Sequence, residues 1–357
     1  VLVTAVPGHA GEIMPVGFTA PVVLIACFAP PRPPGATGAP LLWLAAAVLA
    51  LTHYTHVVLL GLTAGTAIAA QIVLGLGWRA AAARAAAAAV GVLAAAAVLT
   101  AANAAVLGRP AMSPLGPVFL FARLNADGLT TRWLDRHCGD DAPPALCAER
   151  KALARDSQAL LWGDGGSPIG RHVWRARSDA ERWAWVDMLA RVDRAVIADR
   201  PLAFAASAAR GAARQLIAFR ALDDECPEGC GRNRAGGIAY VLARDRPAAL
   251  PALLGSAQVR GTMPRAAVRA VSTPVAAVAL ALLPWAVWRA WRRRDAAALA
   301  FAAATAAALI ANAAMAGALS DVHDRYQSRL AWIAPMLLLF LWLRWRGAAC
   351  PLPPQRP

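Results

Sequence analysis

The sequence predicts an all-α protein, a polytopic transmembrane helical bundle with an inserted extracytoplasmic helical domain. Of its 357 residues, 59% are hydrophobic and 16% are charged, whereas soluble domains are ~45–50% apolar and ~25% charged. Seventeen of the 21 acidic residues lie between Arg109 and Arg269, and the tracts on either side hold the other four. A bilayer imposes such a separation, because an ionised side chain at its centre costs at least ~2.5–3.5 kcal/mol.

Seven apolar stretches are candidates for membrane-spanning helices. They are residues 13–29, 41–52, 55–77, 83–107, 271–291, 296–319 and 330–345. A helix needs ~20 residues to cross ~30 Å of hydrocarbon, so the stretch 41–52 is short. We therefore expect either seven crossings, or five crossings with a re-entrant pair formed over 41–77.

The arginines of the short connections predict which end of the bundle is cytoplasmic, because Lys and Arg are enriched on that side. These residues are Arg32, Arg79, Arg84, Arg289, Arg292, Arg293, Arg294, Arg344, Arg346 and Arg356. Both crossing schemes place all of them on one side. Residues 108–270 and the short loop 320–329 then lie on the other, outer side.

Three regions follow from this orientation. They are N-terminal transmembrane helices over 1–107, an extracytoplasmic and mainly helical domain over 108–270, and C-terminal transmembrane helices with a cytoplasmic tail over 271–357. The composition, dominated by alanine and arginine, is typical of a GC-rich bacterial genome. We expect a multi-pass protein of the bacterial inner membrane whose large loop lies in the periplasm.

Two helices are predicted within the outer domain. Residues 179–199 mix apolar and charged side chains at intervals of three and four, which is the pattern of an amphipathic helix. Pro201 suits the first turn of the next helix, which is predicted to run to about Phe219.

Four of the six cysteines lie in the outer domain, namely Cys138, Cys147, Cys226 and Cys230. An even set in an oxidising compartment predicts two disulfides, and Cys138–Cys147 with Cys226–Cys230 is the pairing that closes the shortest loops. The other two pairings stay open. A four-cysteine zinc site is the alternative, although its ligand pairs are usually spaced more closely than Cys138 and Cys147. We expect disulfides, and neither a metal nor another cofactor.

His53 and His56 are spaced to share one face of a helix, and histidine is a common metal ligand or proton carrier. The sequence offers no third ligand near them. We therefore expect a helix cap or hydrogen bonds between helices. In the functional alternative, both histidines line a cavity beneath the outer domain.

The segment 321–329 (Asp-Val-His-Asp-Arg-Tyr-Gln-Ser-Arg) concentrates ionisable residues between two apolar spans. The planar fork of arginine suits phosphate, because it donates two parallel hydrogen bonds to anionic oxygens. At a membrane surface, the natural phosphate is that of a lipid head group. The alternative is a solvated connector with an internal Asp–Arg pair.

A short polar loop that ends in His-x-Arg-Tyr before the final spans resembles the terminal motif of the GT-C class of membrane glycosyltransferases. The matching residues are His323, Arg325 and Tyr326, and the run Gly11-Glu12-Ile13-Met14-Pro15 before a span adds a weaker match. The resemblance implies a polytopic enzyme that uses a polyprenyl-phosphate-linked sugar on the extracytoplasmic side, within membrane lipid. Arg325 would then bind the lipid phosphate, with His323, Asp324 and Tyr326 shaping the same pocket.

In this class a carboxylate of the first outer loop acts as general base on the acceptor hydroxyl. No segment here resembles that loop, so the resemblance places it upstream of Val1 in a longer protein, and Val16 stands near the place where a further acid is usual. The acids closest to the spans are Glu12, Asp321 and Asp324. None of the three is assigned the role of base, and the catalytic residue stays unknown.

The predicted function is transfer of a sugar from a polyprenyl-phosphate donor to an extracytoplasmic acceptor. The alternative is a non-enzymatic membrane protein, either an envelope-assembly scaffold or, given the few polar residues within the spans, less readily a transporter. The net charge of +15 does not predict nucleic-acid binding, because the arginines are spread over the membrane flanks and the outer domain rather than gathered on one element. The sequence does not define an oligomeric state.

Overall fold

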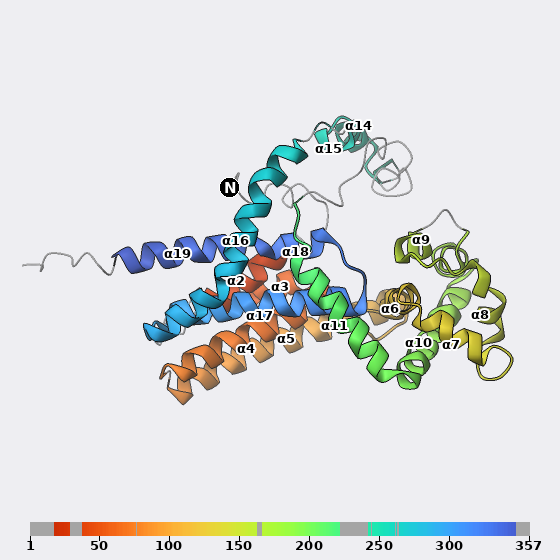
Figure 1. Cartoon of the computed structure of the whole chain (residues 1–357), viewed down its shortest axis with the longest axis horizontal. Helices are drawn as coiled ribbons and strands as arrows, with labels where there is room; N and C mark the ends of the chain where they lie inside the picture. The colour runs from red at the N-terminus through yellow and green to blue at the C-terminus, as the bar shows by residue number, and fades with distance from the viewer. Residues whose placement is uncertain are drawn as a thin grey trace, which may run out of the picture.

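The computed structural model shows a bundle of long helices with a group of shorter helices at one end (Figure 1). It describes residues 18–28, 38–75, 77–162, 166–221, 242–243, 245–260, 262 and 264–347. All regular structure within these residues is helical, which confirms the all-α class. The predictions for Glu12, Cys226 and Cys230 lie outside the described residues.

Five helical segments are long and apolar enough to cross a membrane, which makes the chain a multi-pass membrane protein. They are α4 (Tyr54–Val73), α5 (Trp78–Leu107), α16 (Arg265–Arg292), α17 (Ala296–Leu319), and α18 (Asp324–Ala331) taken together with α19 (Ile333–Gly347). Two shorter apolar helices, α2 (Thr19–Phe28) and α3 (Gly38–Ala50), pack against them.

The predicted spans correspond to these helices, with one correction. Helix α17 has the predicted bounds, whereas α5 and α16 begin earlier than predicted, at Trp78 and Arg265. The loop predicted over 320–329 is wrong for most of its length, since only residues 320–323 are non-helical and α18 begins at Asp324. Several of its polar side chains, namely those of Asp324, Gln327 and Arg329, make hydrogen bonds inside the protein, and buried partners of this kind allow a polar segment to form a helix there.

Helix α17 lies at the centre of the bundle and contacts α2, α4, α11 and α16. Most of its buried residues are alanines, with a few larger side chains such as Phe301, and the surrounding core adds others such as Leu337 of α19. Small side chains allow helix backbones to approach closely. Such packing holds helices together in lipid, where the hydrophobic driving force between helices is missing.

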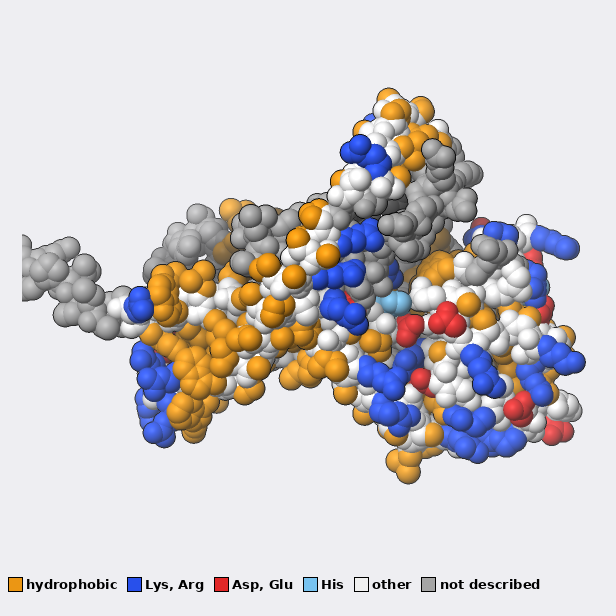
Figure 2. Space-filling model, turned by 45° about the horizontal axis from the view of Figure 1, so that its top comes forward, with side chains coloured by type: hydrophobic (Ala, Val, Ile, Leu, Met, Phe, Trp, Pro, Cys, Tyr) orange, Lys and Arg blue, Asp and Glu red, His pale blue; other side chains and the backbone are white. Residues whose placement is uncertain are grey.

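The basic residues of the last connections lie at the end of the bundle that is remote from the inserted helices. Arg344 of α19 pairs with Asp295, which precedes α17, at 2.6 Å, and Arg293 lies over the ring of Trp345. Figure 2 shows hydrophobic surface between this basic end and the charged group of short helices. A bilayer around the middle of the molecule requires this distribution.

The inserted segment begins with short helices that have a core of their own. They are α6 (Gly116–Ala126), α7 (Leu129–His137), α8 (Pro144–Ala148), η2 (Arg150–Ala152), α9 (Ser157–Trp162), the π-helical turn η3 (Gly170–Trp174) and α10 (Asp179–Asp199). Large side chains such as Phe121, Trp133 and Leu189 fill this core. The disulfide Cys138–Cys147 joins the end of α7 to α8, which confirms one predicted bridge.

Both helices predicted within the inserted segment are present. Helix α10 has the predicted bounds, and the Ser178 side chain caps it by accepting the backbone N–H of Glu181. Helix α11 begins at Pro201, as predicted, and ends at Ile217. Before α16 come the short elements η4 (Pro247–Ala249), α14 (Leu250–Leu254) and α15 (Ala257–Arg260).

Helix α11 leaves the short helices and lies along α17 (Figure 1). The two helices cross where Gly211 faces Gly317, and a methyl group on either glycine would overlap the main chain of the other. A methyl group on Gly211 would also lie 2.7 Å from Nη2 of Arg123 in α6. The inserted segment therefore has two parts, because α6–α10 surround a separate core while α11 packs on the bundle.

Candidate functional site

The ionisable segment that follows α17 lies where the inserted helices meet the bundle, a region we call the junction (residues 320–329 and their partners). Helix α17 ends at Leu319, residues 320–323 turn the chain, and His323 is the N-cap residue of α18. Asp324 occupies the first turn of α18, where the helix dipole favours a carboxylate.

Asp324 connects α18 to the end of α11. Its carboxylate accepts the backbone N–H of Arg220 at 2.8 Å and lies 3.5 Å from Nε of the same residue. Gln215 holds His323, because its amide nitrogen donates to the His323 carbonyl and its amide oxygen accepts the His323 N–H. Asp324 is 8% exposed. Among the four residues that the sequence assigned to a substrate pocket, Asp324 and His323 are thus both held by contacts with α11 or the residues that follow it.

Asp321 and His323 face helix α9. Ser157 donates a hydrogen bond to the Asp321 carboxylate, and the Gln158 amide lies 2.9 Å from Nε2 of His323. The Asp321 carboxylate is 3.8 Å from the same His323 nitrogen and 4.0 Å from Arg123 of α6. The Asp321 side chain keeps 27% exposure, so water and a substrate can reach this acid.

Two guanidinium groups lie near the ring of Tyr326. The Cζ atoms of Arg325 and Arg329 stand 5.1 and 5.7 Å from the centroid of its ring, and Nη2 of Arg325 donates to its hydroxyl at 3.4 Å. The His323 ring meets Tyr326 edge-on at 5.4 Å. The structure thus brings together His323, Arg325 and Tyr326, the three residues of the predicted motif, and adds Arg329.

A buried hydrogen-bond network orients Arg329. Its Nη2 donates to Oδ1 of Asn312 at 2.7 Å, while Nδ2 of Asn312 donates to the Tyr326 carbonyl at 2.6 Å and to Oε1 of Gln327 at 2.8 Å. Gln327 donates in turn to the carbonyl of Leu309. Hydrogen bonds of this kind restrict a buried polar group, so Nη2 of Arg329 is held in the direction of Asn312.

A cavity of about 280 Å³ lies between α4, α6, α17 and α18. Its described lining consists of His53, Tyr54, Thr55, Phe119, Asn312, Met315, Ala316, Ser320, Tyr326 and Arg329. Ligand cavities usually measure ~300–1,000 Å³. The cavity is therefore sized for a small polar group rather than for a lipid chain.

Both early histidines make the contacts expected of a cap and of hydrogen bonds between helices. His53 is the N-cap of α4, where its Nδ1 accepts the N–H of Thr55 at 3.3 Å, and buried His56 pairs with Thr19 of α2 at 2.7 Å. Burial and then the charge of Arg329 lower the pKa of His53 to about 4. The imidazole is therefore neutral at pH 7 and, with Nδ1 as acceptor, carries its proton on Nε2. His53 also lines the cavity, as the functional alternative expects.

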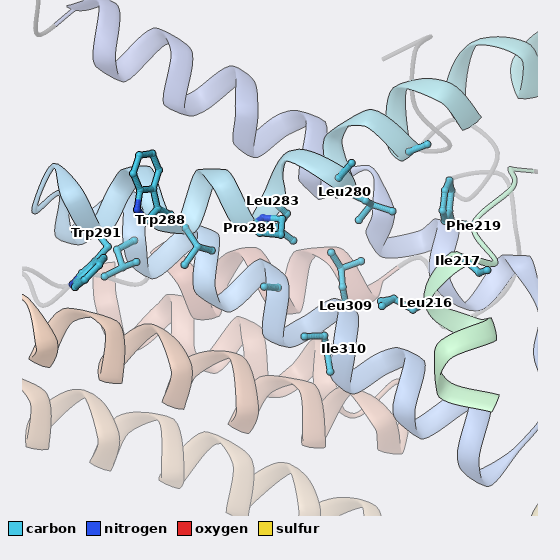
Figure 3. A pocket seen from close by; sticks show the side chains of 15 residues that line it. Leu216, Ile217, Phe219, Leu280, Leu283, Pro284, Trp288, Trp291, Leu309 and Ile310 are labelled. Carbon is cyan, nitrogen blue, oxygen red and sulfur yellow. The ribbon is translucent and has the colours of Figure 1, made fainter. Parts of the chain in front are cut away.

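An apolar groove of about 930 Å³ lies on another face of α17, against α16 and the end of α11 (Figure 3). It is lined by Leu216, Ile217, Phe219, Ala277, Leu280, Ala281, Leu283, Pro284, Val287, Trp288, Trp291, Leu299, Ala306, Leu309 and Ile310. From Ala277 to Trp291 the groove follows α16 over a rise of ~21 Å, which is most of the ~30 Å hydrocarbon layer. Phe219 lies at its other end and directly precedes Arg220, the partner of Asp324.

Fold and site together define a multi-pass α-helical membrane protein with a polar junction at one end of the bundle, next to an apolar lateral groove. No family model, no curated protein and no solved structure matches the chain. Within the described ranges, no group of three or more His, Cys, Asp or Glu residues is arranged to hold a metal ion. Function is therefore inferred from the contacts of the junction and the two cavities.

The sequence pointed to the motif but not to the network behind it. Asn312, Gln327 and Arg329 were not among the predicted site residues. One signal was available, because Asn312 is a polar side chain within a 24-residue apolar helix. Polar residues within spans usually face the bundle interior and often mark functional sites.

Proposed function

We propose that the protein is a GT-C-like glycosyltransferase of the bacterial inner membrane, which transfers a sugar from a polyprenyl-phosphate donor to an acceptor on the periplasmic side. The observation that carries the proposal is the apolar groove and its position. A hydrocarbon chain suits a groove that follows most of the bilayer depth and is lined by apolar side chains. With the chain in the groove, the phosphate lies at the level of the junction.

Arginine side chains supply the charge for that phosphate. Arg220 follows Phe219 of the groove, and its side chain is 64% exposed beside Asp324. Arg325 follows Asp324 in the first turn of α18. The arginine fork donates two parallel hydrogen bonds to a phosphate, and a hydrogen bond to a charged group contributes ~1.5–3 kcal/mol.

The reaction is an inverting displacement. The acceptor hydroxyl oxygen attacks the anomeric carbon, the bond from that carbon to the phosphate oxygen breaks, and polyprenyl phosphate leaves with the bonding electrons. The hydroxyl proton passes to a carboxylate, while Arg325 stabilises the charge on the departing phosphate. The Asp321 side chain is 27% exposed against 9% for Asp324, which favours Asp321 of these two acids as the proton acceptor.

Binding of a polyprenyl-phosphate sugar to the full-length protein in lipid nanodiscs tests the proposal. Arg325→Ala should weaken binding at least tenfold, because at least one charge-assisted hydrogen bond is lost and each 1.4 kcal/mol corresponds to about tenfold. Arg325→Lys should restore binding in part, because an ammonium group keeps the charge but lacks the fork.

Arg292→Ala at the remote end of α16 is the matched control and should bind the donor as the unchanged protein does. Thermal unfolding separates binding from folding. If Arg325→Ala lowers the unfolding temperature and leaves donor affinity unchanged, Arg325 is a structural partner of the nearby acids and the assignment fails. A protein that binds no lipid-linked sugar would instead support the scaffold alternative.

A further inference from the structure

The junction borders two spaces that differ in size and lining, and the donor proposed above needs only one of them. The apolar groove contacts Leu309 and Ile310 of α17, whereas the smaller cavity, which polar and apolar side chains line together, contacts Asn312, Met315 and Ala316. Successive residues of a helix are rotated by ~100°, so the two sets are centred on adjoining faces that meet where Leu309 and Ala316 lie nearly in line. Of the two arginines next to the Tyr326 ring, Arg329 belongs to the described lining of the cavity, whereas Arg325 contacts Tyr326 and is not among the lining residues described.

We propose that the cavity is a second binding site, which takes the oxyanion group (a carboxylate or a phosphate) of a small hydroxylated compound, with Arg329 as its principal ligand. The site extends the proposed function, since such a compound is a fitting acceptor, but its existence does not depend on the donor. It also differs from the motif-based prediction, which assigned anion binding to Arg325 alone.

The first argument is the donor-rich lining. The guanidinium of Arg329 contributes positive charge, and the Nε2–H of neutral His53 contributes a second nitrogen donor. Three residues that carry hydroxyl groups, Tyr54, Ser320 and Tyr326, belong to the same lining. An oxyanion has several acceptor oxygens and can accept hydrogen bonds from such donors at the same time, whereas a neutral apolar ligand cannot.

The second argument is the fixed position of Arg329. Asn312 uses its amide oxygen to hold Nη2 of Arg329 and its amide nitrogen to hold the backbone of α18 and the side chain of Gln327. Arg329 is 4% exposed and Gln327 is fully buried. A guanidinium that is already oriented loses little side-chain entropy when it binds an anion, which raises affinity.

The third argument is the form of the cavity. Tyr54, Phe119 and Tyr326 supply aromatic walls, and the volume is less than a third of that of the groove, about 280 against 930 Å³. A water molecule takes ~30 Å³ in the liquid, so the space corresponds to about nine water molecules. A single sugar-sized group with one charged substituent suits these limits, and a lipid chain does not.

Calorimetric titration of the purified full-length protein tests the site with four probes: glucuronate, glucose, inorganic phosphate, and vesicles that contain phosphatidic acid. Glucuronate should bind at least tenfold more tightly than glucose, which has the same ring without the charge. Inorganic phosphate should compete with glucuronate. Arg329→Gln should abolish the preference for glucuronate, whereas Arg292→Gln and Arg325→Gln should keep it.

Arg329→Gln also removes a hydrogen bond of the buried network and could therefore destabilise the fold. A second variant separates loss of glucuronate binding from loss of folding. Tyr54→Phe deletes one hydroxyl at a position with 36% exposure and should weaken glucuronate binding about threefold with the unfolding temperature unchanged. Equal affinity for glucuronate and glucose, or a preference that survives Arg329→Gln in folded protein, would overturn the proposal. Binding of phosphatidic-acid vesicles alone, lost in Arg329→Gln, would assign the cavity to a lipid head group and overturn it as well.

Discussion

The bundle and the short inserted helices are both all-helical, but they are packed in opposite ways. The bundle core consists largely of alanine around α17, and it admits polar side chains such as Asn312 and Gln327 in a closed network. The core of α6–α10 consists of large side chains, including Phe121, Trp133 and Leu189, with ion pairs on its surface.

The surroundings of each region explain the difference. In water, burial of apolar surface contributes ~25 cal/mol per Å². The inserted helices are therefore held together by the burial of large apolar side chains. Lipid gives no such drive, and helices in it are held by close backbone contact and by internal hydrogen bonds. The stability of the bundle should therefore depend on small residues where helices cross. The stability of the inserted helices should depend on large side chains in their core.

The glycine crossing offers the strongest test of this contrast. Gly211→Ala or Gly317→Ala adds a single methyl group that overlaps main-chain atoms of the other helix. Because backbone yields less than a side chain, we expect a loss above the usual overpacking range of ~1–3 kcal/mol. Thermal unfolding in detergent micelles, with the yield of folded protein, measures it.

Gly65→Ala in α4 is the matched control, because no atom lies within 4 Å of the added methyl group. It should leave the unfolding temperature unchanged or raise it slightly, since alanine favours the helix by up to ~1 kcal/mol over glycine. Equal behaviour of the variants at positions 65 and 211 would show that the crossing is looser than described.

Removal of the disulfide should have the next largest effect, confined to the inserted helices. The bridge Cys138–Cys147 spans a sequence separation of 9, and the chain-entropy relation gives ~2–3 kcal/mol for a loop of this length. The double variant Cys138→Ser, Cys147→Ser should lose amide protection from hydrogen exchange in α7 and α8. Unchanged protection there, or a loss in α17 instead, would contradict the separation of the two cores.

Asp193 should give the smallest effect, and a stabilising one. This residue of α10 is 2% exposed, its carboxylate oxygens have no hydrogen-bond partner among the described residues, and burial raises its pKa well above the ordinary value. The folded state then binds the proton more tightly than the unfolded state. The free energy of unfolding therefore falls as pH rises from the ordinary carboxyl pKa, ~3.9, towards the raised one.

Asp193→Asn removes this titration. It should raise the unfolding temperature at pH 8, where the unfolded state would release the proton of Asp193, and should have no advantage at pH 4. Unfolding temperatures measured from pH 4 to pH 8 check the slope. Asp140→Asn at an exposed position is the control, and an identical pH dependence in both variants would show that Asp193 ionises normally.

Much of this architecture can be predicted from the sequence, because apolar length and helical periodicity are local signals. They gave the bounds of α10 and α17 and the start of α11 at Pro201. The arginine pattern likewise indicated which connections share one end of the bundle. The even number of cysteines predicted disulfides, and the pairing that closes the shortest loops includes the observed bridge Cys138–Cys147.

The remaining features depend on contacts between distant parts of the chain. A run of polar residues predicts a solvated loop when its hydrogen-bond partners are unknown. For α18 and its N-cap residue, the partners are Gln215, Arg220 and Asn312, which lie elsewhere in the chain. Nothing local distinguishes Gly211 from a glycine that faces lipid. Arg329 lies at the end of the motif, but its place in a cavity depends on α4 and α6, which come much earlier in the chain.

The crossing of Gly211 and Gly317 also determines the order in which parts of the protein can fold during synthesis. The ribosome completes α17 roughly 100 residues after α11, several seconds later at ~5–20 residues per second. During that interval α6–α10 can close their own core, while α11 has no helix to pack against. The junction therefore forms last, when α17 and α18 enter the membrane. A nascent chain released before that point would contain folded helices α6–α10 but would lack the junction and its two binding sites.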